Sequence, residues 1–230
     1  MHLYPVEKSV ITLDSLLGID DLQNYTTFLD WGGNQGNLLS FDNFPIEASN
    51  YTCVDVDSYA IKIGKQTYPE ANFVHWNRFN KVYNETGNTV EPFPELDPNQ
   101  DVIFAFSVFT HTDFTEFKET LDWMKSYFNY KKIIISLIGT NSTKLLERFY
   151  NRRVERRGFS VDIRELANEP NTNMAYLTDH DQLDRNEESS SQDHCETFLV
   201  FYNTEWIAEQ MGGTIHISHE LEYPYLVITP

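Results

Sequence analysis

The strongest constraint on the fold is a glycine-rich turn that follows an apolar segment in the first part of the chain. Residues 28–38 read FLDWGGNQGNL, an apolar start and an acid followed by a turn too rich in Gly and Asn for regular structure. Glycine is used where the backbone needs a positive φ or must approach a ligand closely. Asn tolerates the same left-handed region, so we expect Asn34 to serve where a third glycine could stand.

A second apolar strand follows this turn and also ends in a carboxylate. Residues 51–55 read YTCVD, so the strand ends at Asp55. A strand, a glycine turn and an acid about 20 residues further on form the arrangement by which nucleotide-binding α/β folds hold an adenosine. Glycine-rich turns are common, however, and a tight connection without a ligand is the plain alternative for this stretch taken alone.

The rest of the chain alternates between strand and helix patterns, which favours a largely parallel sheet. We expect helices over residues 58–68, from Asp113 onward, over 142–157, and from Asn203 or Thr204 to the glycine pair at 212–213. The further strands are expected at residues 72–75, 102–107, 132–137, 197–202, 214–218 and 225–229. Residues 168–194 are polar, acidic and rich in Ser, which indicates a mobile loop or lid.

Two segments resemble motifs of the class I S-adenosylmethionine (SAM)-dependent methyltransferases. The turn resembles motif I, an apolar pair followed by D/E-x-G-x-G-x-G, in which Asp30, Gly32 and Gly36 match and Asn34 replaces the middle glycine. Residues 101–111, DVIFAFSVFTH, resemble motif IV, an aspartate and an apolar strand followed by Ser-Val-Phe-Thr-His. The second match is the more specific one, and the resemblance extends over nearly the whole chain.

The resemblance implies a fold, a cofactor and an activity. The expected α/β fold is a seven-stranded Rossmann-like sheet with helices on both faces and a reversed last strand. A single domain would span residues 1–230, with residues 141–202 inserted as a substrate cap whose aromatic side chains form an acceptor pocket. The cofactor would be S-adenosyl-L-methionine, and the reaction would move its methyl group to a small-molecule or peptide acceptor by in-line displacement.

The same resemblance assigns site residues. Asp55 would bind the ribose, Asn77 the adenine amino group, and Trp76 either the adenine face or the core. Asp30 would orient the turn or meet the amino group of the cofactor. The residues expected to bind the cofactor are Asp30, Gly32, Gly33, Asn34, Gly36, Asp55, Val56, Trp76, Asn77, Phe106 and Ser107.

His111 is the candidate general base, because an imidazole accepts a proton near neutral pH. A structural hydrogen bond at the start of a helix is the alternative role. No set of His, Cys and acidic residues has the spacing of a metal site, and the two cysteines suggest no disulfide framework.

The composition limits the partners. With 35 acidic residues against 17 Lys and Arg, the formal charge is −18, which argues against binding to nucleic acids or anionic membranes. The sequence contains no apolar stretch long enough to span a membrane and no secretory signal region, so we expect a cytoplasmic protein. It leaves open whether two copies form a homodimer. A basic cluster consists of Arg148, Arg152, Arg153, Arg156 and Arg157. It would pair with the protein's own acids or hold a substrate anion.

Two other functions are compatible with parts of the pattern. A cofactor-binding regulatory module with the same fold and little turnover would explain Asn34 in place of glycine. A nicotinamide-dependent oxidoreductase would use the partial G-x-x-G spacing of Gly33 and Gly36, but the closing pair of strands argues against it.

Overall fold

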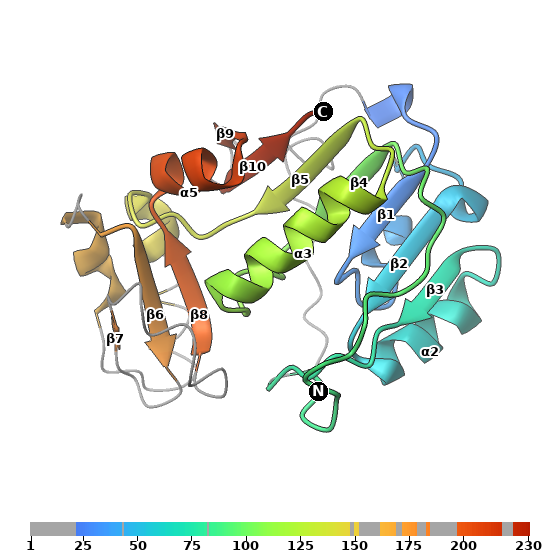
Figure 1. Ribbon diagram of the computed structural model, residues 1–230, viewed down its shortest axis with the longest axis horizontal. Helices are drawn as coiled ribbons and strands as arrows, with labels where there is room; N and C mark the ends of the chain where they lie inside the picture. Colours follow the sequence, from blue (N-terminus) through green and yellow to red (C-terminus); the bar gives the residue numbers. More distant parts are fainter. Residues whose placement is uncertain are drawn as a thin grey trace.

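The structure is a computed structural model, and it contains a large twisted sheet and a smaller one (Figure 1). It describes residues 22–42, 44–81, 83–147, 150–151, 162–168, 172–178, 183–184, 197–217 and 223–230. The arginine cluster lies outside these residues. Within the described segments, no helix combines the length and the apolar character needed to cross a membrane.

The large sheet has seven strands in the order β3-β2-β1-β4-β5-β10-β9. The strands are β1 (Phe28–Trp31), β2 (Tyr51–Asp55), β3 (Asn72–His75), β4 (Val102–Ala105), β5 (Lys132–Ser136), β9 (Thr214–Ile217) and β10 (Pro224–Ile228). β1 to β5 pair in parallel, whereas β10 runs antiparallel to both β5 and β9. The expected sheet with a reversed last strand is therefore confirmed.

The strand order places a switch point between β1 and β4. The chain leaves β1 toward β2 and β3 on one side and returns to β4 on the other side of β1. In open α/β sheets, ligands bind beyond the carboxyl ends of the strands at such a point. The topology thus directs attention to the ends of β1, β2 and β4.

Helices cover both faces of this sheet, as expected. They are α2 (Ser58–Thr67), α3 (Phe114–Tyr127) and α5 (Thr204–Met211). Alternate strand residues point to opposite faces, so Leu29 packs with α3 and α5 in one core cluster and Phe28 packs with α2 in another. The apolar stripe of α3 meets the sheet, and its residues Phe117, Leu121 and Met124 are completely buried.

The helix ends follow local side-chain chemistry. The Asp57 carboxylate accepts hydrogen bonds from two backbone N–H groups at the start of α2, and Asp113 accepts one from Glu116 N at the start of α3. Asn203 caps α5, which ends at Gly212 with a left-handed φ of 66°. Since α2 and α3 follow β2 and β4, these caps fix helix N-termini at the carboxyl edge of the sheet.

A three-stranded sheet packs on a second core, while Met174, Val200 and Tyr202 of its strands belong to a core cluster of the large sheet. It has the order β7-β6-β8 and consists of β6 (Met174–Thr178), β7 (Leu183–Asp184) and β8 (Thr197–Tyr202). The core beneath it includes Leu146, Leu166 and Leu177. Hydrogen bonds from Tyr202 N to Ile138 O and from Val200 N to Thr110 O join β8 to the main body.

This second sheet corrects one expectation. The prediction of a loop throughout residues 168–194 is wrong at residues 174–178 and 183–184, which form β6 and β7. β6 reads MAYLT, a short apolar run whose Met174, Ala175 and Leu177 are buried. Because polar residues surround so short a run, its periodicity does not stand out in the sequence.

Phe73 of β3 shows how closely α2 approaches the sheet. A Cβ on Gly64 would collide with the Phe73 ring, and one on Gly36 would lie 2.8 Å from Phe73 Cζ. Gly64 has no unusual φ, so contact with Phe73, and not backbone conformation, requires glycine at this helical position.

We therefore predict that Gly64→Ala destabilises the protein by about 1–3 kcal/mol, as overpacking of a core does, although Ala normally favours a helix by about 1 kcal/mol over Gly. Urea denaturation measures the change. In a Phe73→Ala background the same substitution should be neutral or stabilising. A stabilising effect of Gly64→Ala in the wild-type background would contradict this packing.

Candidate active site

A cavity of about 180 Å³ opens at the carboxyl ends of β1, β2 and β4, where the switch point lies. Its walls come from the glycine turn, from the ends of β2 and β4, from the start of α3 and from the segment that follows β3. The described lining residues are Trp31, Gly32, Asn34, Val54, Asp55, Val56, Trp76, Phe79, Asn80, Tyr83, Phe106, Ser107, Val108, Phe109, His111, Thr112, Glu116 and Thr120.

The glycine turn uses the left-handed conformation three times. Gly32, Asn34 and Gly36 have φ values of 76°, 57° and 80°, so the expectation that Asn34 replaces a glycine is confirmed for the backbone. A Cβ on Gly32 would also collide with Val108 after β4. The turn therefore passes close to β4, with its amide groups near the cavity.

Asp55 joins the turn to the end of β2. Its Oδ2 accepts a hydrogen bond from Asn34 N at 2.7 Å, and its Oδ1 accepts one from Asp57 N at 2.8 Å. Burial raises the pKa of Asp55, and the hydrogen bonds from Asp57 and Asn34 oppose that rise. Each carboxylate oxygen can accept a second hydrogen bond, so Asp55 can receive two hydroxyl groups from a ligand in the cavity.

Asp30 lies beneath the turn and does not line the cavity. The Tyr51 hydroxyl donates a hydrogen bond to Asp30 Oδ2, and a Cβ on Gly33 would collide with the same carboxyl group. Burial raises the pKa of Asp30 to about 7, the hydrogen bond from Tyr51 lowers it, and the charge of Asp55 raises it further. Of the two roles expected for Asp30, this position suits support of the turn.

The end of β4 carries a second strained position. Ser107 has a φ of 59°, and its N–H donates to Ser136 Oγ at 2.7 Å. Left-handed backbone at a residue other than Gly is uncommon and often marks functional sites. His111 lies four residues further on, and its ring packs edge to face against that of Tyr83, with 5.8 Å between the ring centroids. Both Ser107 and His111 line the cavity.

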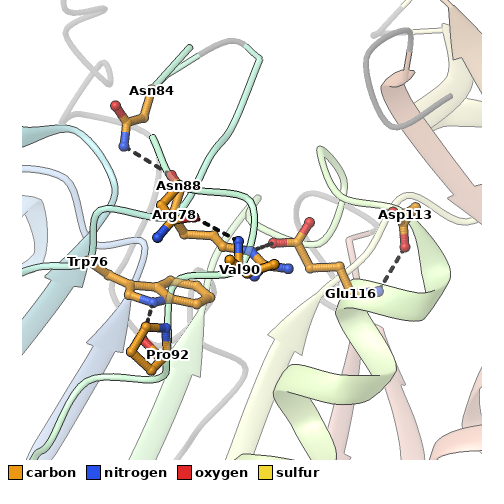
Figure 2. A network of polar contacts seen from close by, with 8 residues as sticks. All are labelled: Trp76, Arg78, Asn84, Asn88, Val90, Pro92, Asp113 and Glu116. Carbon is orange, nitrogen blue, oxygen red and sulfur yellow. Dashed lines mark hydrogen bonds and ion pairs between the residues drawn. The ribbon is translucent and has the colours of Figure 1, made fainter. Parts of the chain in front are cut away.

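Trp76 follows β3 and serves the core and the cavity together. It is buried between Trp31 and Phe93, whose ring centroids lie 5.1 Å and 5.4 Å from its own. Its Nε1 donates a hydrogen bond to Pro92 O at 2.8 Å (Figure 2). Both alternatives for Trp76 are thus compatible with its position. Asn77 is exposed and is not among the lining residues; its Oδ1 accepts a hydrogen bond from Asn84 Nδ2 at 3.2 Å.

The structure brings most of the expected site residues to one cavity. Those that line it are Gly32, Asn34, Asp55, Val56, Trp76, Phe106, Ser107 and His111. Asp30, Gly33, Gly36 and Asn77 stand outside the described lining, the two glycines within the turn itself. The aromatic residues that line the cavity come from the main body, whereas Tyr150 and Tyr202 of the expected cap do not reach it.

Two further groups of lining residues were missed in the sequence. One is a polar stripe at four-residue spacing around the start of α3, made of Thr112, Glu116 and Thr120. The other is Phe79, Asn80 and Tyr83, from the connection between β3 and β4. The spacing of the stripe was a usable signal, because it lies beside the apolar face of the same helix. The connection has no periodicity to reveal its side chains.

Two residues of the cavity lining contain a buried polar atom without a described hydrogen-bond partner. Within the described part of the chain, Asn34 Oδ1 and Thr112 Oγ1 have no hydrogen-bond partner. Buried polar groups are nearly always satisfied in native proteins. Both residues line the cavity, so the two atoms lie close to the space that a ligand would occupy.

Comparison with known proteins identifies the fold. No family model matches the sequence, and neither does any curated protein. Among solved structures, human N-acetylserotonin methyltransferase in complex with SAM has a TM-score of 0.52 at 12% identity, over 97% of this chain and 53% of that one. The DhpI–SAM–HEP complex has a TM-score of 0.50 at 12% identity, over 94% of this chain and 84% of that one.

A third solved structure agrees with these two. An O-methyltransferase family protein from Burkholderia thailandensis has a TM-score of 0.50 at 14% identity, over 94% of this chain and 54% of that one. At such low identity the likeness establishes architecture. The chain has the class I methyltransferase fold, as expected from its motifs.

The buried Asp30 predicts a specific pH dependence of stability. Its pKa rises from about 4 in the unfolded chain to about 7 in the folded one, so the folded state favours the protonated carboxyl. The resulting stability is complete below about pH 4 and is lost as the pH rises through 7.

We therefore expect the free energy of unfolding of the wild type, relative to Asp30→Asn, to fall by about 1.4 kcal/mol per pH unit between about pH 5 and pH 7. Urea denaturation of both proteins across this range measures the difference. A pH-independent difference would show that Asp30 is ionised throughout.

Proposed function

We propose that this protein is a SAM-dependent methyltransferase that acts on a small-molecule acceptor. The observation that carries the proposal is the Asp55 carboxylate, held at the cavity beside a turn in which Gly32, Asn34 and Gly36 are left-handed. The methyltransferase fold places this pair at the switch point of the sheet, where an adenosine would be bound.

The cavity offers a fitting group for each part of SAM. The remaining lone pairs of Asp55 suit the two ribose hydroxyls. Trp76 and Val56 present apolar surface for the adenine ring. Asn77, two residues beyond the end of β3, is our candidate for the adenine amino group. The turn residues Gly32 and Asn34, with Ser107 across from them, would hold the methionine part.

The chain's own contribution to the reaction is mainly positioning. Bound SAM would supply a methyl group on a sulfonium, a good leaving group for in-line displacement. The protein must hold the acceptor atom in line with it and exclude water. As the acceptor's lone pair forms the new bond, its proton passes to a base, and His111 at the end of the β4 segment is our candidate.

The cavity also supports an acceptor of small size. It is bounded on one side by α3 and on the other by the β3–β4 connection. The small sheet within residues 141–202, which is joined to the main body through β8, is our candidate for a cap over the acceptor.

Asp55→Ala tests the cofactor site. We expect the affinity for S-adenosylhomocysteine (SAH) to fall on the order of a hundredfold, because the ribose loses charge-assisted hydrogen bonds and Asn34 N loses its acceptor. Isothermal titration calorimetry measures the change. Asp122→Ala makes the same change of charge at an exposed position of α3 and should leave the affinity unaltered. SAH binding that survives in Asp55→Ala would contradict the ribose assignment.

His111→Ala tests the base. We expect SAH to bind as in the wild type while methyl transfer slows by about 100-fold, the usual contribution of a positioned base. The assay follows label from methyl-labelled SAM into a panel of small molecules, with SAH formation as the second readout. Equal transfer rates would assign His111 a structural role, and failure of the wild type to methylate anything would favour a regulatory module.

A further inference from the structure

Several residues of the cavity lining are not among those expected to bind the cofactor. The polar stripe of Thr112, Glu116 and Thr120 forms one wall. Phe79 and Tyr83 from the β3–β4 connection contribute aromatic rings to it. Because none of these residues is assigned to the cofactor, we take them as the candidates for contact with the acceptor. The inference below rests on the proposed methyltransferase function.

The described lining of the cavity is acidic. Among the lining residues that the structure describes, the carboxylates are Asp55 and Glu116, and there is no Lys or Arg. Asp55 is committed to the turn and the ribose, so Glu116 is the acidic group that an acceptor would meet. A carboxylate in a concave site favours cations and repels anions, and its field is strengthened where water is excluded.

Glu116 already has a basic neighbour, but the contact is loose. Arg78 Nε lies 3.6 Å from Glu116 Oε1, beyond hydrogen-bonding distance, and both side chains are partly exposed (Figure 2). Such pairs contribute little to stability. Arg78 also lies over the Trp76 ring at 5.9 Å, so it keeps a favourable contact if a ligand takes Glu116 from it.

Thr112 supplies the second recognition group. Its Oγ1 is buried and has no hydrogen-bond partner among the described residues, and it stands one turn before Glu116 on the same wall. A hydroxyl and a carboxylate four residues apart can bind one donor group together. Phe79 and Tyr83 add aromatic rings to the lining, and their faces suit an apolar or flat molecule and its positive charge.

We infer that the acceptor carries an ammonium group that binds Glu116 and Thr112, and a ring that packs against Phe79 and Tyr83. The methyl group goes to a different atom of this molecule, because an ammonium nitrogen has no lone pair to form the new bond. A charge-assisted hydrogen bond to Glu116 displaces the weaker contact of Arg78. Carboxylate-bearing analogues of the same shape are rejected by Glu116. The ammonium group fixes the acceptor's orientation.

The test uses three probes of one shape and different charge: 2-phenylethylamine, 2-phenylethanol and phenylacetate. Each is titrated into protein saturated with SAH, after SAH binding itself has been measured. We expect 2-phenylethylamine to bind at least about tenfold more tightly than phenylacetate. In Glu116→Gln the two should bind within about twofold of each other, with the SAH affinity unchanged.

Two variants sharpen the result. Glu119→Gln removes a carboxylate from an exposed position of α3 and should keep the full preference for the amine. Arg78→Gln removes the basic neighbour that lies 3.6 Å from Glu116 and should raise the affinity for the amine. Equal or tighter binding of phenylacetate, survival of the preference in Glu116→Gln, or no amine binding at millimolar concentration would overturn the inference. Failure of SAH to bind would instead overturn the methyltransferase assignment.

Discussion

The site depends on the two hydrogen bonds that the Asp55 carboxylate accepts from the backbone of Asn34 and Asp57. They tie the glycine turn to the end of β2 and to the start of α2, so three elements meet at one side chain. A buried carboxylate is costly unless it is hydrogen-bonded, and these N–H groups offset part of that cost. The same arrangement leaves Asp55 at the cavity with unused lone pairs.

A second acid supports the turn from below. Asp30 and Asp55 are both buried, and the charge of each opposes ionisation of the other. With the pKa of Asp30 raised to about 7, this carboxyl is mostly protonated in mildly acidic solution and adds little negative charge beside Asp55. Gly33 is required above Asp30 because a side chain would occupy the space of its carboxyl group. Asp30, the acid of the segment that resembles motif I, therefore supports the glycine turn from beneath.

Much of the fold could be predicted from local sequence. Asp113 and Asn203 cap their helices at the expected starts, and the apolar run at 102–107 contains the buried strand β4. The left-handed conformation of Asn34 also followed from residue chemistry. These features depend on nearby residues, and local propensities and capping side chains determine them.

What could not be predicted depends on contacts between distant segments. β6 is stabilised by β8, more than twenty residues further on, and a short strand has no signal without its partner. The β3–β4 connection has no regular structure, yet Arg78 meets Glu116 of α3 and Trp76 meets Pro92 (Figure 2). Its contribution of Phe79 and Tyr83 to the cavity follows from that folding back, which no periodicity encodes.

The central claim is that the end of β2 and the glycine turn together hold an adenosine. A crystal structure of the protein grown with SAH tests it most directly. The account predicts both ribose hydroxyls within hydrogen-bonding distance of Asp55 and the adenine ring against Trp76. SAH bound elsewhere, or a cavity that stays closed around its own side chains in saturating SAH, would contradict it.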